Sequence, residues 1–164
     1  MKLATEERTL VIAGVGALGG VLAALGTTMT WFTIEIGDVP APGGSATGME
    51  GRDGWTVVAA SVAAFVAAAF VVLRRNPMAA KVLFLAAGCI TTVVAIAGIL
   101  DATSKDHEVE EAFGIPADRV SASVGTGLWF VALGGISELA AGALSKATTD
   151  DAEPEPVSAP AVNP

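Results

Sequence analysis

Glu138 is the residue whose surroundings most clearly raise a chemical question. It lies inside an apolar run that extends from about residue 124 to residue 144. An ionisable side chain inside a membrane span is costly, and it commonly marks a proton or ion pathway or a polar contact between helices. Three roles fit the sequence: a structural carboxyl that reaches the headgroups or bonds within a bundle, a polar contact to a partner subunit, and a proton or cation carrier. We favour the structural role.

The depth of this carboxyl depends on where its helix enters the membrane. If Trp129 marks the outer interface, a rise of 1.5 Å per residue puts the carboxyl about 13 Å down, near the bilayer centre. If the span begins near Val120, the carboxyl lies about 27 Å along and approaches the cytoplasmic surface. The stretch VSASVG is a poor match for lipid, which favours the central position. A carboxyl there is expected to be protonated or hydrogen-bonded to Ser137, Thr91 or Thr92.

Few other residues have the types and spacing that chemistry requires. Glu110 and Glu111 follow His107 by three and four positions and would share a helix face with it, a spacing compatible with binding a divalent cation. A lone histidine beside flexible carboxylates is more typical of a solvated acidic face, so we expect no metal. The single cysteine, Cys89, excludes an intrachain disulfide and is expected to be a small buried residue.

Catalytic motifs are missing from the sequence. It contains no nucleophile elbow, no zinc motif and no phosphate-binding loop. We therefore predict a protein that is not an enzyme and that needs no cofactor.

Four apolar runs dominate the chain and set its class. Hydrophobic residues make up 52% of the sequence and the mean hydropathy is +0.63, more than one soluble core requires. Each run is close to the ~20 residues that cross a bilayer. The chain is therefore predicted to be an all-α membrane protein, a four-transmembrane-helix bundle in a domain of residues 1–146. The expected spans cover residues 9–31, 55–73, 79–100 and 124–144.

The distribution of charge predicts the orientation. Six of the nine lysines and arginines lie before the first run, between the second and third, or after the fourth. Basic residues near span ends stay in the cytoplasm, so both termini are predicted to be cytoplasmic and the loops 32–54 and 101–123 to lie outside. These loops hold ten acidic residues and three basic ones. An acidic outer face argues against nucleic-acid binding and favours cations or basic partners.

The first run has an alternative interpretation as a cleaved signal peptide, because a charged start precedes an apolar stretch. Its apolar stretch is longer than a usual signal core, and Glu6 and Glu7 lie in the amino-terminal segment. We therefore favour a retained helix.

Small residues at intervals of four mark faces where helices can approach closely. Gly16, Gly20 and Ala24 form such a face in the first run, and Gly134 and Gly142 lie four residues on either side of the glutamate. We expect the partner of the first face to be another helix of the same chain, with an interface between subunits as the alternative. If Glu138 contacts a partner subunit, Gly134 and Gly142 would let the helix of that subunit approach on the same face.

The loops and the tail have their own patterns. The segment WFTIEIG alternates with the period of a strand, which predicts a short extracytoplasmic β-hairpin or loop cap. Trp31, Trp55 and Trp129 are expected to anchor the spans at the membrane interface. The second loop is expected to hold a short helix that Thr103 caps and that Gly114 and Pro116 end. Residues 147–164 are acidic and proline-rich, which predicts a disordered cytoplasmic tail.

The order of features over nearly the whole chain carries a family resemblance. A Gly/Ala-rich helix ends in WFTI, an outer loop closes in DGW, an RRNP turn follows, and the last helix opens VGTGLWFVALGG. This order resembles small four-span membrane proteins of actinobacteria, among them the tryptophan-associated transmembrane proteins, and implies a plasma-membrane location. A claudin-like layout is similar in outline, but the paired loop cysteines of that group are missing.

A second resemblance concerns Gly14, Gly16, Gly20 and Glu138, which are similar to positions of the four-span proteolipids of rotary ATPases. The third run lacks their glycine series, and large acidic loops do not suit a smooth ring.

The predicted function follows from these observations. We expect an accessory or scaffolding component of a cell-envelope membrane complex in the bacterial plasma membrane. Its partners would be lipid, other membrane or envelope proteins, or further copies of itself. The alternative is a small proton- or cation-coupled transporter or channel that uses Glu138.

Overall fold

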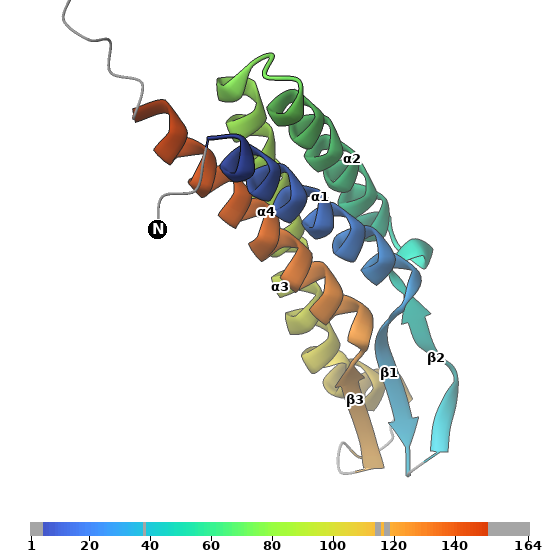
Figure 1. The fold of residues 1–164 in the computed structure, drawn as a ribbon. Coiled ribbons are helices and arrows are strands. Elements are labelled where there is room, and N and C mark those ends of the chain that lie inside the picture. Colours follow the sequence, from blue (N-terminus) through green and yellow to red (C-terminus); the bar gives the residue numbers. More distant parts are fainter. Residues whose placement is uncertain (1–4, 38, 114–115, 117–118, 151–164) are drawn as a thin grey trace, which may run out of the picture.

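Helices make up most of the described chain. The computed structural model describes residues 5–37, 39–113, 116 and 119–150. The elements, in chain order, are α1 (Thr5–Thr28), β1 (Thr30–Ile36), β2 (Val39–Thr47), the short helix η1 (Gly48–Glu50), α2 (Arg52–Val72), α3 (Pro77–Phe113), β3 (Val120–Val124) and α4 (Thr126–Asp150). Four long helices lie side by side, and the strands gather at one end of them (Figure 1).

The helices form a ring in which each packs against two neighbours. α1 contacts α2 and α4, and α3 contacts the same two helices. The start of α1 and the turn between α2 and α3 lie at the end of the bundle opposite the strands (Figure 1). We call this the turn end and the opposite one the sheet end. The tight turn predicted from RRNP is confirmed, and it makes α2 and α3 antiparallel neighbours.

Local interactions fix this turn. Arg74 adopts a left-handed conformation with φ of 50°, and the N–H of Arg75 reaches back five residues to a helix carbonyl, as in a Schellman C-cap. Asn76 then caps the next helix, because its side-chain oxygen accepts a hydrogen bond of 3.0 Å from the N–H of Ala79. Pro77 is the first residue of α3, a position that suits proline because the N–H it lacks would have no helical partner there.

Four helices are long and apolar enough to cross a membrane, which suggests a multi-pass membrane protein. Large apolar side chains are exposed on the outside of all four, including Leu18 on α1, Val62 on α2, Val93 on α3 and Leu133 on α4. The buried positions are mostly occupied by alanine, glycine and hydroxyl side chains. Large apolar residues outside and small ones inside are the pattern expected where lipid surrounds the helices. The segments are Glu6–Thr28, Arg52–Val72, Pro77–Ser104 and Thr126–Ser145.

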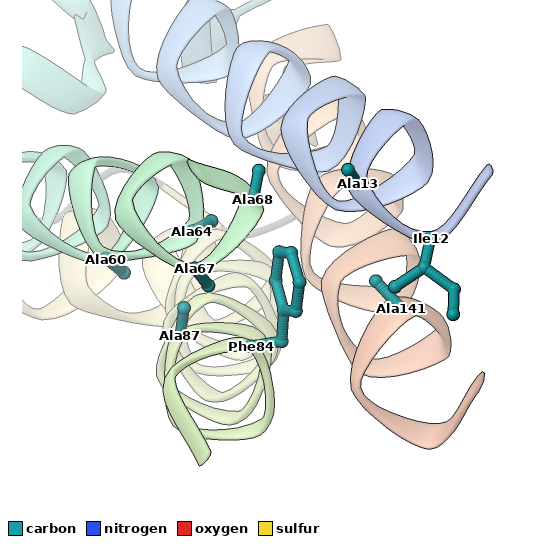
Figure 2. Packing of buried hydrophobic residues seen from close by; sticks show 9 residues of the cluster. All are labelled: Ile12, Ala13, Ala60, Ala64, Ala67, Ala68, Phe84, Ala87 and Ala141. Carbon is teal, nitrogen blue, oxygen red and sulfur yellow. The ribbon is translucent and has the colours of Figure 1, made fainter. Parts of the chain in front are cut away.

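Two apolar clusters occupy the bundle interior in the part of the chain that the structure describes. The Phe84 cluster packs one ring among small residues of all four helices (Figure 2): Ile12, Ala13, Ala60, Ala64, Ala67, Ala68, Phe84, Ala87 and Ala141. The Trp31 cluster lies nearer the strands and has larger members: Ala23, Trp31, Val57, Ala95, Leu128 and Val131.

The predicted hairpin is confirmed and is part of a larger sheet. β1 pairs antiparallel with β2, and Gly37 begins the connection between them with a φ of +57° that a side chain would disfavour. A third strand, β3, pairs antiparallel with the other edge of β1, from Phe32 opposite Val124 to Ile36 opposite Val120. The strand order is β2-β1-β3, so the α1–α2 connection and the α3–α4 connection both contribute to one sheet.

Other parts of the chain differ from the prediction. α3 continues through Phe113, beyond the expected span end at residue 100. Thr103 does not cap a new helix, because its hydroxyl donates to the carbonyl of Leu100 within α3 at 2.9 Å. α4 runs to Asp150, so residues 147–150 of the expected disordered tail are helical, and residues 151–164 lie outside the described chain.

Candidate functional site

Glu138 is fully buried in the bundle, with 0% of its surface exposed. Its Oε2 accepts a hydrogen bond of 3.3 Å from the hydroxyl of Thr91 on α3, and its Oε1 has no partner. It lies 12 residues after Thr126, the first residue of α4, or about 18 Å along the helix. The side chain faces the interior of the bundle rather than the outside.

The hydroxyl groups near Glu138 behave differently from other buried hydroxyls. Thr27, Ser61 and Ser145 each donate to a carbonyl three or four residues earlier in their own helix, at 2.7 to 2.9 Å. Thr91 instead donates across to another helix, and the Thr92 hydroxyl is buried with no partner. The Thr91 bond that the sequence anticipated is therefore confirmed.

Ser137 does not bond to the carboxyl, although the sequence allowed it. Its hydroxyl donates to the carbonyl of Leu133 at 2.8 Å, so it is satisfied within α4.

Glycines bring the neighbouring helices against this carboxyl. A Cβ on Gly19 of α1 would lie 3.0 Å from Cγ of Glu138 and 2.7 Å from the carbonyl oxygen of Gly134. A Cβ on Gly135 would lie 2.5 Å from the hydroxyl oxygen of Thr92. Side chains at either glycine would push α1 or α3 away from α4. The carboxyl is thus enclosed because its neighbours are the smallest residues.

The glycines predicted to pack helices do so within the chain. Gly16 faces the ring of Phe84, and Gly20 faces the carbonyl oxygen of Ser61, 3.3 Å from where its Cβ would be. Gly134 packs against α1 and Gly142 against Leu85 of α3.

Ala24, the last member of the first face, is half-buried. Because helices of the same chain cover Gly134 and Gly142, this face of α4 is not available to a partner subunit. The intramolecular interpretation of the first face is supported, and the partner-subunit role of Glu138 is not.

Sequence reasoning missed two glycine pairs at which the backbones of α1 and α4 approach each other closely. Gly19 and Gly26 of α1 oppose Gly134 and Gly127 of α4, with hypothetical Cβ positions 2.6 or 2.7 Å from the opposing carbonyl oxygens. Within each helix the two glycines are seven residues apart, which is two helix turns. This shared interval in α1 and α4 was a signal in the sequence from which the contact could have been predicted.

The three tryptophans fall into two groups. Trp55 and Trp129 are 60% and 56% exposed, as interfacial anchors would be. Trp31 is only 8% exposed, and its indole N–H donates to the carbonyl of Gly26 at 2.9 Å. Gly127 lies directly against its ring. Trp31 therefore fills the junction between helices and sheet instead of facing the headgroups.

Metal binding finds no support in the part of the chain that the structure describes, where no group of three or more His, Cys, Asp or Glu side chains lies together. His107, Glu110 and Glu111 belong to α3, but their side chains lie outside the described part. Cys89 is exposed on the outside of α3 and not buried as expected. A lone exposed thiol on an apolar helix surface defines no site.

Comparison with known proteins gives no relative: no protein family, curated protein or solved structure matches this chain. The interpretation of function therefore depends on the geometry alone.

Proposed function

We propose that this protein is a multi-pass protein of the bacterial plasma membrane that serves as an accessory or scaffolding component of a cell-envelope complex. Support comes from the four membrane-length helices and from the small folded sheet at one end of them. Its interior helix faces are occupied by its own helices, so partners would be met at the sheet or on the lipid-facing surface.

The observation that carries this proposal is the continuity between sheet and bundle. β1 begins two residues after α1 ends, and β3 ends two residues before α4 begins. The N–H of Gly125 donates to the carbonyl of Trp31 at 2.7 Å. This bond joins the α1–β1 connection to the β3–α4 connection. A sheet fixed in this way presents a defined surface to a partner, and it loses little conformational freedom when it binds.

The proposed orientation puts the sheet outside the membrane and both termini in the cytoplasm. Basic residues at the turn end, among them Arg74, Arg75 and Lys81, support this direction. Glu35, Glu50 and acidic residues of the second loop then give the outer end a negative charge. A partner with a basic surface would be attracted to it.

Site-specific cross-linking in intact membranes tests the scaffolding role. A photoreactive amino acid at Ser121 or Ser123, two exposed positions of β3, is expected to give discrete cross-linked protein adducts. The matched control is the same amino acid at Met78, which is exposed at the turn end. Adducts that form from β3 and persist in mild detergent support the proposal. A chain that stays monomeric from every position would contradict it.

A second candidate function, a small proton- or cation-coupled transporter, is favoured by one observation. Glu138 faces the interior of the bundle and accepts a hydrogen bond from Thr91 of another helix. A carboxyl on the surface of the bundle would have neither property. Purified protein in liposomes should then show a proton-dependent flux that Glu138→Gln abolishes and Ser61→Ala leaves unchanged. No flux with the unmodified protein would remove this candidate.

A further inference from the structure

Among the residues that the structure describes, two buried side-chain oxygens in the interior of the bundle have no hydrogen-bond partner. They are Oε1 of Glu138 and the hydroxyl oxygen of Thr92, both buried. Thr92 follows Thr91 on α3, and it lies against Gly135, which is three residues before Glu138 on α4. The side chains of Thr91, Thr92 and Glu138 therefore gather where α3 and α4 face each other.

A charge on this carboxyl would have little to compensate it. Its single hydrogen bond comes from Thr91, and the basic side chains of the described residues belong to loops and to the first turns of helices. A buried carboxylate without a cationic partner or several hydrogen-bond donors is far more costly than a buried neutral acid. A positively charged ligand would remove that cost.

The donor set selects a proton over a metal ion. Calcium takes six to eight oxygen ligands and magnesium six in near-octahedral geometry. The described side chains at this position supply one carboxyl and two hydroxyls, and one of the hydroxyls already donates to the carboxyl. A proton needs only one oxygen.

We propose that Glu138 and Thr91 form a buried, reversible proton-binding site. The proton is carried on Oε1, which has no partner, and Oε2 is the carbonyl oxygen that accepts from Thr91. Thr92 supplies a second hydrogen-bonding group that the rest of the bundle does not use. This inference deepens the second candidate function and rests on it for its physiological meaning, although the site can be detected without any transport.

Difference infrared spectroscopy of the full chain in lipid nanodiscs tests the site directly. A protonated carboxyl gives a carbonyl stretching band that a carboxylate does not. We expect this band in the unmodified protein at neutral pH, a small shift in deuterated water, and its loss as the pH is raised. In Glu138→Gln the band should disappear.

Two further variants assign the band even if Glu138→Gln fails to fold. Thr91→Val removes the hydrogen bond to the carbonyl oxygen, so the band should move to higher frequency. Ser61→Ala removes a buried hydroxyl that bonds only within α2, and it should leave the band in place.

Each contrary outcome has a separate meaning. A missing band at neutral pH, a band unaffected by both Glu138→Gln and Thr91→Val, or a band that sodium ions abolish at constant pH would overturn the proton site. A band with no flux in liposomes would keep the site and remove the transport function. Flux without the band would keep transport and remove the site.

Discussion

The two apolar clusters of the bundle solve the packing problem in different ways. In the Phe84 cluster, alanines of α2 and their neighbours surround one large ring (Figure 2), so the helices approach closely and the ring fills the remaining centre. In the Trp31 cluster, Leu128 and Val131 of α4 pack with a tryptophan that comes from the start of a strand. The first cluster joins helices only, and the second joins helices to the sheet.

This difference teaches where the chain tolerates change. In lipid, helices associate through packing and hydrogen bonds and not through the hydrophobic effect. Loss of the ring among the alanines would therefore remove packing contacts that nothing else in the cluster replaces. The Trp31 cluster is also held by a hydrogen bond from the indole N–H to the carbonyl of Gly26. Glu138 is a third kind of interior residue, one whose polar atoms are incompletely satisfied.

The largest expected effect is that of Phe84→Ala. Removing the ring leaves a cavity between helices that cannot collapse without breaking the alanine contacts, and the free energy of unfolding should fall by about 3–5 kcal/mol. Denaturant titration in micelles would measure it. Phe65→Ala is the control, because Phe65 is 42% exposed on α2 and should change stability by less than about 1 kcal/mol. Equal losses would mean that the ring is not central.

Trp31→Ala should cost nearly as much, about 3 kcal/mol, because it empties the junction between bundle and sheet. Trp31→Phe keeps most of the packing but loses the N–H donor to Gly26, at a cost of about 1 kcal/mol. Trp129→Ala should leave the unfolding free energy nearly unchanged because that ring is on the outside. Thermal unfolding of the three variants checks this order, and a larger loss from Trp129→Ala would reverse the assignment of core and anchor.

Gly16→Ala sharpens the comparison by adding one methyl group beside Phe84. Overpacking should lower the unfolding free energy by about 1–3 kcal/mol. Gly14→Ala is the matched control, since a Cβ there meets nothing within 4 Å and alanine is the better helix former. Combining Gly16→Ala with Phe84→Leu should recover part of the loss relative to the sum of both single changes. Simple additivity would show that the two residues do not share the same space.

The smallest expected difference separates the carboxyl site from an ordinary buried hydroxyl. Thr91→Val keeps the side-chain shape but leaves Oε2 of Glu138 without its donor, which should cost about 1–2 kcal/mol. Ser61→Ala should cost less than about 1 kcal/mol, because the carbonyl of Val57 keeps its helical hydrogen bond. Both are measured as midpoints of denaturant unfolding. Indistinguishable midpoints would indicate that the Thr91 bond contributes nothing to stability.

The sequence by itself determined the elements that depend on composition and local pattern. Four apolar runs fixed the four long helices because hydropathy is a property of the residues and not of their contacts. Pro77 is a residue suited to the start of a helix and begins α3, and the alternation in WFTIEI predicted β1. The alternation in VSASV was also present, but a five-residue strand has no stable partner until a distant segment is brought beside it.

Only the tertiary structure decided which faces meet. The spacing of Gly134 and Gly142 fits a helix of the same chain as well as one of a partner, and only the packing of α1 and α3 on α4 separates the two. The composition that predicts an interfacial tryptophan is the same for Trp31 and Trp129, yet one is buried by its chain and the other is not. For Glu138, the sequence supplied the carboxyl and its apolar run. Its burial, its single bond to Thr91 and its unpaired oxygen depend on residues 47 positions apart that come together only in the folded bundle.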